Sequence, residues 1–288
     1  MVIAHLIGGL GNQMFQYAAA RALASKRDTS LLLDISSFDS YTLHQGFELD
    51  RIFSGDFNPA KKSDVQQMLG WQSSNSVRSY LHRPAHSWLR KKSLAIEPSF
   101  EYWQGFEHLS ANTYLSGYWQ SERYFSSIED IIREDFRFST PMNAENLALA
   151  DRIANSEAIS LHVRRGDYIN NSAYASCSLE YYQSAIDCLA KQYDFPTFFI
   201  FSDDINWVRE NLKIEHSHVY IDNNHGDQSY NDMRLMSLCK HNIIANSSFS
   251  WWGAWLNANE TKTIIAPKKW FNTNLNSKDL IPASWVRL

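Results

Sequence analysis

The feature that most constrains the fold is a regular alternation of short apolar runs and amphipathic stretches between residues 158 and 266. The apolar runs are rich in β-branched and aromatic residues, as buried strands are, and the stretches between them have helical periodicity. We predict strands at 158–163, 197–202, 217–221, 242–245 and 262–266, and helices at about 178–193, 204–212, 229–239 and 248–257. This alternation indicates an α/β protein whose C-terminal half is a doubly wound parallel sheet.

The first half of the chain is less regular. The predicted elements there are an N-terminal strand, a helix at 13–26, strands at 30–34 and 113–117, and helices near 124–135 and 144–154. Between about 54 and 112 the sequence has no clear period, and basic residues are scattered among aromatic ones. We place the domain boundary near residue 154, which gives domains 1–154 and 155–288.

Two arginines and an aspartate follow the predicted strand at 158–163, in the run His162-Val-Arg-Arg-Gly-Asp-Tyr168. Ligands of open α/β sheets bind outside the carboxyl ends of the strands. A guanidinium group also matches phosphate oxygens better than an ammonium group does. Arg164 and Arg165 are therefore candidates for an anion site. The alternative is that an arginine pairs with Asp167 only to order the turn.

Two further strand-to-helix turns carry similar chemistry. Gly8, Gly9 and Gly11 allow positive φ and close approach of a ligand to a helix N-terminus. Their spacing matches neither the dinucleotide fingerprint nor the P-loop, so packing alone would also explain them. Ser247 and Ser248 precede a helix that carries three tryptophans, and their hydroxyls can cap this helix or face an anion. Three such turns in one chain favour a shared phosphate site.

These motifs together resemble the α-1,2-fucosyltransferases of glycosyltransferase family 11. The similar segments keep the family's order and are Gly8-Gly-Leu-Gly-Asn-Gln-Met-Phe-Gln-Tyr17, Gly117-Tyr-Trp-Gln-Ser-Glu-Arg-Tyr-Phe125, His162-Val-Arg-Arg-Gly-Asp-Tyr168, Phe201-Ser-Asp-Asp204 and Asn246-Ser-Ser-Phe-Ser-Trp-Trp-Gly-Ala254. The resemblance implies two Rossmann-like domains of the GT-B type facing across a cleft, with the C-terminal domain binding GDP-β-L-fucose and the N-terminal domain on the acceptor side. It also implies inverting transfer to the 2-hydroxyl of a terminal galactose, with no obligatory metal and no cofactor beyond the co-substrate GDP-fucose.

The resemblance assigns Arg164 to the β-phosphate of the donor. Other donor-site residues expected from the matching motifs are Gly11, Asn12, Asn246, Ser247, Ser248 and Phe249. Asp203 and Asp204 are further candidates, since a carboxylate can accept the two N–H groups of guanine, and we choose Asp203, although an aspartate after a strand often only caps the next helix. His162 is either a packed histidine or, like its family counterpart, a neighbour of the nucleotide.

The catalytic base is less clearly marked. An inverting transfer needs a carboxylate or histidine near the acceptor hydroxyl. Asp167 is the nearest carboxylate to the arginines, and we name it with Arg164 as a catalytic residue. Glu122 and His5 are alternatives that the sequence leaves open.

Composition narrows the functional classes. The chain has 288 residues and a net charge of −4, which argues against a nucleic-acid-binding protein. It has no apolar run of transmembrane length and no signal-like start, so we expect a cytoplasmic protein. Its three cysteines lack metal-site spacing, which predicts neither a disulfide framework nor a zinc site.

The acceptor is the least defined part of the prediction. A bacterial enzyme of this family is expected to act on a lipid-linked O-antigen or surface polysaccharide unit at the inner face of the cytoplasmic membrane. Aromatic residues of the first half could stack on a sugar, although most are expected to be core: Trp71, Trp88, Trp103, Trp119, Tyr80, Tyr102 and Tyr118. The basic residues near them predict a solvated surface, with contact to a membrane or lipid-linked acceptor as the alternative: Arg78, Arg83, Arg90, Lys91 and Lys92. Other functions left open are another linkage, another GDP-sugar, and a non-catalytic glycan- or nucleotide-binding protein.

Overall fold

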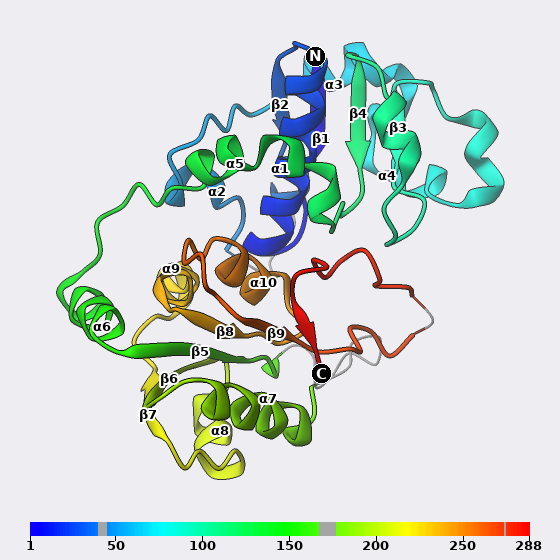
Figure 1. Ribbon diagram of the computed structural model, residues 1–288. Helices are drawn as coiled ribbons and strands as arrows, with labels where there is room; N and C mark the ends of the chain where they lie inside the picture. Colours follow the sequence, from blue (N-terminus) through cyan, green and yellow to red (C-terminus); the bar gives the residue numbers. More distant parts are fainter. Residues whose placement is uncertain (40–44, 167–176, 274) are drawn as a thin grey trace. The chain divides into compact units, whose positions relative to one another are not determined.

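The computed structural model describes residues 1–39, 45–166, 177–273 and 275–288 (Figure 1). The chain forms two compact units. The N-terminal unit comprises Met1–Ser139 with Lys278–Leu280, and the C-terminal unit comprises Thr140–Ser277 with Ile281–Leu288. Each unit contains one parallel sheet with helices, which confirms the predicted α/β class.

The division falls after Ser139 rather than near residue 154, because helix α6 (Ala144–Ala154) belongs to the C-terminal unit. Ile153 of this helix is part of a core cluster with strands of that unit. Asn146 also donates to Oδ1 of Asn224 over 2.8 Å and accepts from the Asn224 amide over 3.0 Å. A helix at a boundary is assigned by its packing partners, which lie far away in sequence.

The C-terminal unit is built on a six-stranded sheet in the order β10-β9-β8-β5-β6-β7, and all its neighbouring strands pair in parallel. Its strands are β5 (Glu157–Val163), β6 (Pro196–Ser202), β7 (Ser217–Ile221), β8 (His241–Ile243), β9 (Ile264–Ala266) and β10 (Val286–Arg287). Its other helices are α7 (Leu179–Gln192), α8 (Ile205–Asn211), α9 (Tyr230–Leu238) and α10 (Ser248–Trp255). The predicted alternation is confirmed, and the structure adds β10, whose two residues are too few to produce a sequence pattern.

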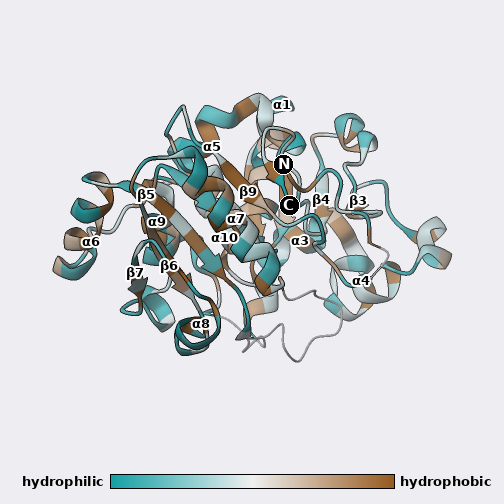
Figure 2. Cartoon of the chain, turned by 60° about the horizontal axis from the view of Figure 1, so that its bottom comes forward, coloured by the Kyte–Doolittle hydropathy of each residue, from teal (hydrophilic) through white to brown (hydrophobic). Residues whose placement is uncertain are grey.

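Helices cover both faces of this sheet, as a doubly wound arrangement requires (Figure 1). Alternate strand residues point to opposite faces. Ile159 and Leu161 of β5 pack in one core with α7 and α8, whereas Ala158 packs in a second core with α6 and α9. Figure 2 shows the resulting hydrophobic colouring along β5 and β6.

The N-terminal unit has a four-stranded parallel sheet in the order β2-β1-β4-β3. Its strands are β1 (Val2–His5), β2 (Leu31–Asp34), β3 (Leu94–Ile96) and β4 (Thr113–Ser116). Its helices are α1 (Leu10–Lys26), α2 (Leu49–Ile52), α3 (Lys62–Leu69), α4 (Asn75–Leu81) and α5 (Glu129–Asp135). Strand β3 lies inside the stretch in which the sequence had no clear period, because three residues cannot establish one. The predicted helix at 124–135 is shorter, since two 3-10 turns, Glu122–Tyr124 and Ser126–Ile128, precede α5.

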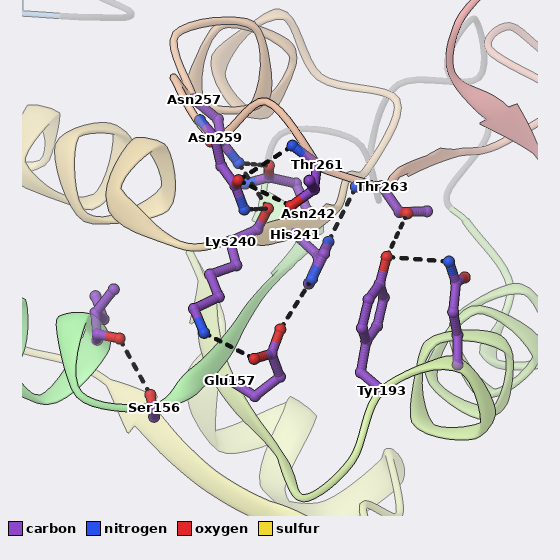
Figure 3. A network of polar contacts seen from close by, with 12 residues as sticks. Ser156, Glu157, Tyr193, Lys240, His241, Asn242, Asn257, Asn259, Thr261 and Thr263 are labelled. Carbon is purple, nitrogen blue, oxygen red and sulfur yellow. Dashed lines mark hydrogen bonds and ion pairs between the residues drawn. The ribbon is translucent and has the colours of Figure 1, made fainter.

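A dense polar network closes the amino edge of the C-terminal sheet (Figure 3). Glu157, at the start of β5, accepts from Nζ of Lys240 over 2.7 Å and lies 3.1 Å from Nε2 of His241. The backbone N–H of Thr263 donates to Nδ1 of His241 over 3.0 Å, so the proton of this neutral ring is on Nε2 and points at Glu157. Buried Asn242 extends the network, because its side chain donates to Oγ of Ser160 and accepts from Asn257.

Candidate functional site

The C-terminal sheet has a topological switch point between β5 and β8. From β5 the chain continues outward through β6 and β7, and from β8 it continues in the opposite direction through β9 and β10. Crossover connections then diverge from the two central strands, which leaves a crevice at their carboxyl ends, the usual ligand position in such sheets. The segment after β5 contains Arg164, and the segment after β8 contains Asn246 and Ser247. Two of the three motifs predicted to form a phosphate site therefore meet at this edge.

His162 lies at this edge, within β5. Its side chain is almost fully buried, and its ring centroid is 6.0 Å from that of Phe249 at the start of α10. Nδ1 has no hydrogen-bond partner within the described ranges. Burial, with a smaller contribution from the Arg164 charge, lowers the pKa of His162 to about 3, so the ring is neutral at physiological pH. A buried polar atom without a partner costs stability, so the position of Nδ1 at the carboxyl edge makes His162 a candidate for a ligand contact.

Asp203 holds the loop that carries the two arginines. Its carboxylate accepts the backbone N–H groups of Arg165 and Gly166 over 2.9 and 3.0 Å, and its Oδ2 lies 3.2 Å from Nε of Arg164. The partly exposed Arg164 side chain is thus directed by a carboxylate that directly follows the neighbouring strand β6. Asp204, not Asp203, caps α8 by accepting from the N–H of Trp207 over 3.3 Å.

Arg165 has a different environment from Arg164. Its guanidinium lies 3.5 Å from the centroid of the Trp207 ring, and its Nε lies 3.3 Å from Oδ2 of Asp204. Cation–π contact and an ion pair to one helix end are typical of a residue that stabilises packing. The contacts therefore distinguish the two adjacent arginines. Arg164 is held against the carboxylate that fixes its loop, whereas Arg165 packs on Trp207.

The start of α10 is capped from within. Oγ of Ser247 accepts from the N–H of Phe249 over 3.3 Å. The Asn246 side chain is fully buried, donates to the carbonyl of Trp270 over 2.9 Å and accepts from the thiol of Cys177 over 3.3 Å. Asn246 is thus positioned to fix the turn, while the first helical residue, Ser248, is only partly buried. The tryptophans of α10 are buried core residues: Trp251, Trp252 and Trp255.

A cavity of about 540 Å³ lies at the same edge of the C-terminal unit. The N-terminus of α7 and the segment after β9 line it, and its residues include Cys177, Tyr181, Lys268 and Lys269. Its volume falls in the range of small-ligand pockets. The hydrogen bond from Cys177 to Asn246 connects its wall to the turn after β8.

The glycine turn of the N-terminal unit follows β1, which lies beside β4 at the centre of its sheet. Gly8 has a φ of 87°, and a Cβ placed there would lie 2.6 Å from Nδ2 of Asn12, so a side chain at this position would be strained and crowded. Oδ1 of Asn12 accepts from Gln120 over 2.8 Å. Buried Gln16 accepts from the N–H of Ile7 and donates to the carbonyl of Gly117, over 3.0 and 3.1 Å. These amides join the turns after β1 and β4, beside the buried Gly11.

Glu97, after β3, is a polar residue of this edge that the sequence did not single out, because its strand was not recognised. Its two carboxylate oxygens accept the N–H groups of Tyr118 and Trp119 over 2.7 and 2.9 Å. Burial nevertheless raises its pKa to about 7. Trp119 has a φ of 55°, so the carboxylate secures a turn that the backbone alone would disfavour.

The base candidates have separate outcomes. His5 is 2.7 Å from Oγ of Ser37, and burial lowers its pKa to about 4, so its ring is neutral at physiological pH but a weak base. Glu122 begins a 3-10 turn and is partly buried. Asp167 lies outside the described residues.

Within the described ranges, no group of three or more histidine, cysteine or acidic side chains is arranged to hold a metal ion. Among the helices in these ranges, none combines the length and apolar character needed to cross a bilayer.

The whole chain, residues 1–288, matches the model of glycosyl transferase family 11. The chain belongs to this family. It is 38% identical to an α-1,2-colitosyltransferase of Escherichia coli, over 100% of this chain and 99% of that protein. It is 33% identical to the O-antigen biosynthesis glycosyltransferase WbnK of Escherichia coli, over 98% of this chain and 99% of that protein.

More distant proteins agree with this assignment. Galactoside α-(1,2)-fucosyltransferase 1 of Rattus norvegicus is 25% identical over 88% of this chain and 63% of its own length. The fold is similar to that of the α-1,6-fucosyltransferase NodZ, in a crystal soaked with GDP-fucose, with a TM-score of 0.54, 16% identity, and coverage of 88% of this chain and 91% of that one. The predicted family membership and the predicted GT-B class of fold are confirmed, and the chain is a glycosyltransferase.

Proposed function

We propose that this family 11 member is an inverting transferase that moves L-fucose from GDP-β-L-fucose to the 2-hydroxyl of a terminal galactose. The family supports glycosyl transfer, and a curated relative that acts on galactosides in α-1,2 linkage supports the linkage. Its similarity to WbnK supports a role in O-antigen or surface polysaccharide synthesis.

The observation that carries the proposal is the combination of Arg164 and His162 at the switch point. An anionic leaving group is stabilised by a cation that is already oriented, and Asp203 provides that orientation through three contacts with the Arg164 loop. The unpartnered Nδ1 of His162 offers a polar contact beside the arginine loop. The N-terminus of α10, which begins at Ser248, supplies the positive end of a helix dipole, although Ser247 already accepts the N–H of Phe249 there.

In the proposed reaction the galactose 2-hydroxyl attacks C1 of fucose on the face opposite the diphosphate. The C1–O bond to the β-phosphate breaks, GDP leaves with both electrons, and the configuration at C1 inverts. Arg164 compensates the charge that develops on the β-phosphate. Asp167 remains our sequence-based choice for the group that receives the hydroxyl proton, and Gly11 and Asn12 remain predicted donor-site residues of the N-terminal unit.

The donor sugar has a second candidate, because the chain is 38% identical to an α-1,2-colitosyltransferase. Colitose is L-fucose without its 3-hydroxyl. A site that hydrogen-bonds a hydroxyl rejects an analogue lacking it by roughly 10⁴-fold, whereas an apolar pocket discriminates far less. Initial rates with GDP-fucose and GDP-colitose, measured side by side, therefore decide between the two sugars.

The test is an acceptor screen with both donors against lactose, N-acetyllactosamine, Gal-β-1,3-GalNAc and Gal-β-1,3-GlcNAc, with the linkage determined by NMR. We expect GDP-fucose to give Fuc-α-1,2-Gal. Preferred use of GDP-colitose would replace fucose but keep the linkage, and a product substituted on GlcNAc would overturn the linkage.

Turnover should survive EDTA. Activity that is lost with EDTA and restored by manganese would contradict the metal-independent mechanism.

Nucleotide binding is tested separately by thermal shift. GDP should raise the melting temperature in a concentration-dependent manner, and NAD should not. A protein stabilised by GDP but inactive on every donor and acceptor would support the non-catalytic binding alternative.

A further inference from the structure

A basic aromatic surface of the N-terminal unit has no role in the proposed reaction. We define it by Trp71, Tyr80, Arg83, Trp88, Lys91 and Lys92. The exposed fractions of its aromatic side chains are 79% for Trp88, 61% for Trp71 and 50% for Tyr80. Arg83, Lys91 and Lys92 are also exposed. Large aromatic rings with this exposure gain none of the hydrophobic stabilisation that burial against a partner would give, and a cluster of them marks an interaction surface.

The surface rests on a fixed support. Buried Gln72, next to Trp71, donates to the carbonyl of Leu89 over 2.6 Å and accepts from the N–H of Lys91 over 3.1 Å. It therefore joins the segment that contains Trp71 to the segment that contains Trp88 and Lys91. Nε of Arg90 donates to the carbonyl of Leu81 over 2.9 Å and ties the end of α4 to the same segment.

Rings and cations are also ordered relative to each other on this surface. The Tyr80 ring stacks on His86 with centroids 3.8 Å apart, and the guanidinium of Arg83 lies 5.8 Å from the Tyr80 centroid. Beneath them, Leu69, Leu81 and Leu94 belong to one buried core cluster. The exposed aromatic residues thus project from a packed layer and are not the tip of a long loop.

The charge of this segment points to one class of partner. No aspartate or glutamate occurs between Asp64 and Glu97, although the whole chain has a net charge of −4. Tryptophan and tyrosine favour the headgroup region of a bilayer, and clustered lysine and arginine are attracted to anionic lipids. Protein–protein interfaces, in contrast, are depleted in lysine. We infer that the basic aromatic surface binds the surface of an anionic lipid bilayer, with Trp88 entering the headgroup region and the lysines contacting lipid phosphates.

This inference is independent of which sugar is transferred. It needs only that the enzyme act on an acceptor held at a membrane. The full chain is tested by co-sedimentation with phosphatidylcholine vesicles, with and without about one quarter phosphatidylglycerol. We expect binding to the anionic vesicles only, and release when NaCl rises from about 0.05 M to about 0.5 M.

Matched variants locate the contact. Lys91→Gln/Lys92→Gln should weaken partitioning roughly 20- to 30-fold, at about fivefold per cation near an anionic surface. Trp88→Ala should weaken it roughly tenfold through lost apolar burial. The controls remove equivalent groups from the C-terminal unit, namely Lys191→Gln/Lys213→Gln for exposed charge and Phe195→Ala for an exposed ring, and should bind like the wild type.

Several outcomes would overturn the inference. They are wild-type binding that is equal for neutral and anionic vesicles, binding that persists at high salt, and surface variants that bind as well as their controls. A dimer in lipid-free sedimentation that Trp88→Ala dissociates, without lipid binding by the wild type, would instead assign the surface to a second copy of the chain. The salt and lipid dependence of the wild type needs no variant, so it decides the question even if a variant misfolds.

Discussion

The two edges of the C-terminal sheet are made by the same central strands but differ in how their polar groups are satisfied. At the amino edge, Glu157 and His241 are both bonded, and both ring nitrogens of His241 have partners (Figure 3). At the carboxyl edge, His162 is more deeply buried than Glu157, yet its Nδ1 has no partner in the described part of the chain. A network in which every polar atom has a partner contributes stability, whereas an atom without a partner can form a hydrogen bond with a ligand.

The contrast extends to the cations. Lys240 at the amino edge pairs with Glu157, and this pair adds little beyond local stability because the lysine is nearly half exposed. Arg164 at the carboxyl edge is directed by Asp203 in a loop that Asp203 also holds by its backbone. Four predictions test whether the edges differ in function as they do in bonding.

The largest effect is expected at Arg164. Arg164→Ala should lower the rate 10²- to 10³-fold, or about 3–4 kcal/mol of barrier, because an oriented cation no longer faces the leaving diphosphate. GDP affinity, measured by calorimetry, should fall as well. Lys240→Ala removes a cation from the other edge and should leave the rate per folded molecule unchanged. Unaltered GDP affinity in the Arg164 variant would remove this residue from the phosphate site.

The second prediction breaks the closed edge. The Asn242 amide donates to Oγ of Ser160 over 2.7 Å and accepts from Asn257 over 2.8 Å, all in the buried layer. Asn242→Ala should lower the free energy of unfolding by about 2–3 kcal/mol, because buried partners lose their bonds. Urea denaturation measures this loss, and Asn155→Ala, at an exposed helix end, is the control. A large drop in activity under conditions in which the variant is fully folded would contradict a purely structural role.

The third prediction concerns how the stability contributed by His162, at the carboxyl edge, depends on pH. The pKa of His162 is about 3 in the fold, below the ordinary value of 6.5. Between these values the folded state binds fewer protons than the unfolded state. The contribution of His162 to the free energy of unfolding is therefore complete above pH 6.5 and is lost as the pH falls toward 3. At a pH near 5 the loss from this one group is about 2 kcal/mol.

His162→Phe should remove that contribution and weaken GDP binding. The difference in unfolding free energy between variant and wild type, compared at neutral pH and near pH 5, isolates it from other groups. These include the Asp232 carboxyl, whose pKa burial raises to about 7 and whose effect has the opposite sign. An equal difference at both pH values would contradict the neutral, buried state of His162.

The smallest effect separates the neighbouring arginines. Arg165→Ala should lower stability by about 1 kcal/mol through loss of its contact with Trp207, with GDP affinity retained. Arg209→Ala removes a similar contact, 4.3 Å from the Tyr220 centroid, and serves as its control. Arg165→Ala that abolishes GDP binding without loss of stability would place both arginines in the phosphate site.

Prediction from sequence succeeded best where one local pattern was long. The C-terminal strands and helices were recognised within a few residues because each presents a complete apolar period. Strand β3 and the assignment of α6 were not recoverable, since the first has three residues and the second depends on Asn224 and on distant core residues. The same limit applies to Glu97, whose partners lie in the turn after β4.

The sequence by itself determined the α/β class, the order of the C-terminal elements and the motifs that identify the family. Tertiary structure decided which charged groups of those motifs have spare bonding capacity. Asp203 and Asp204 are adjacent and alike in sequence, yet one holds the Arg164 loop and the other caps α8. The cap formed by Asp204 has its partner three residues along the chain, so a local pattern encodes it. The partners of Asp203 lie 38 and 37 residues away, and only the parallel pairing of β5 with β6 brings them to this carboxylate.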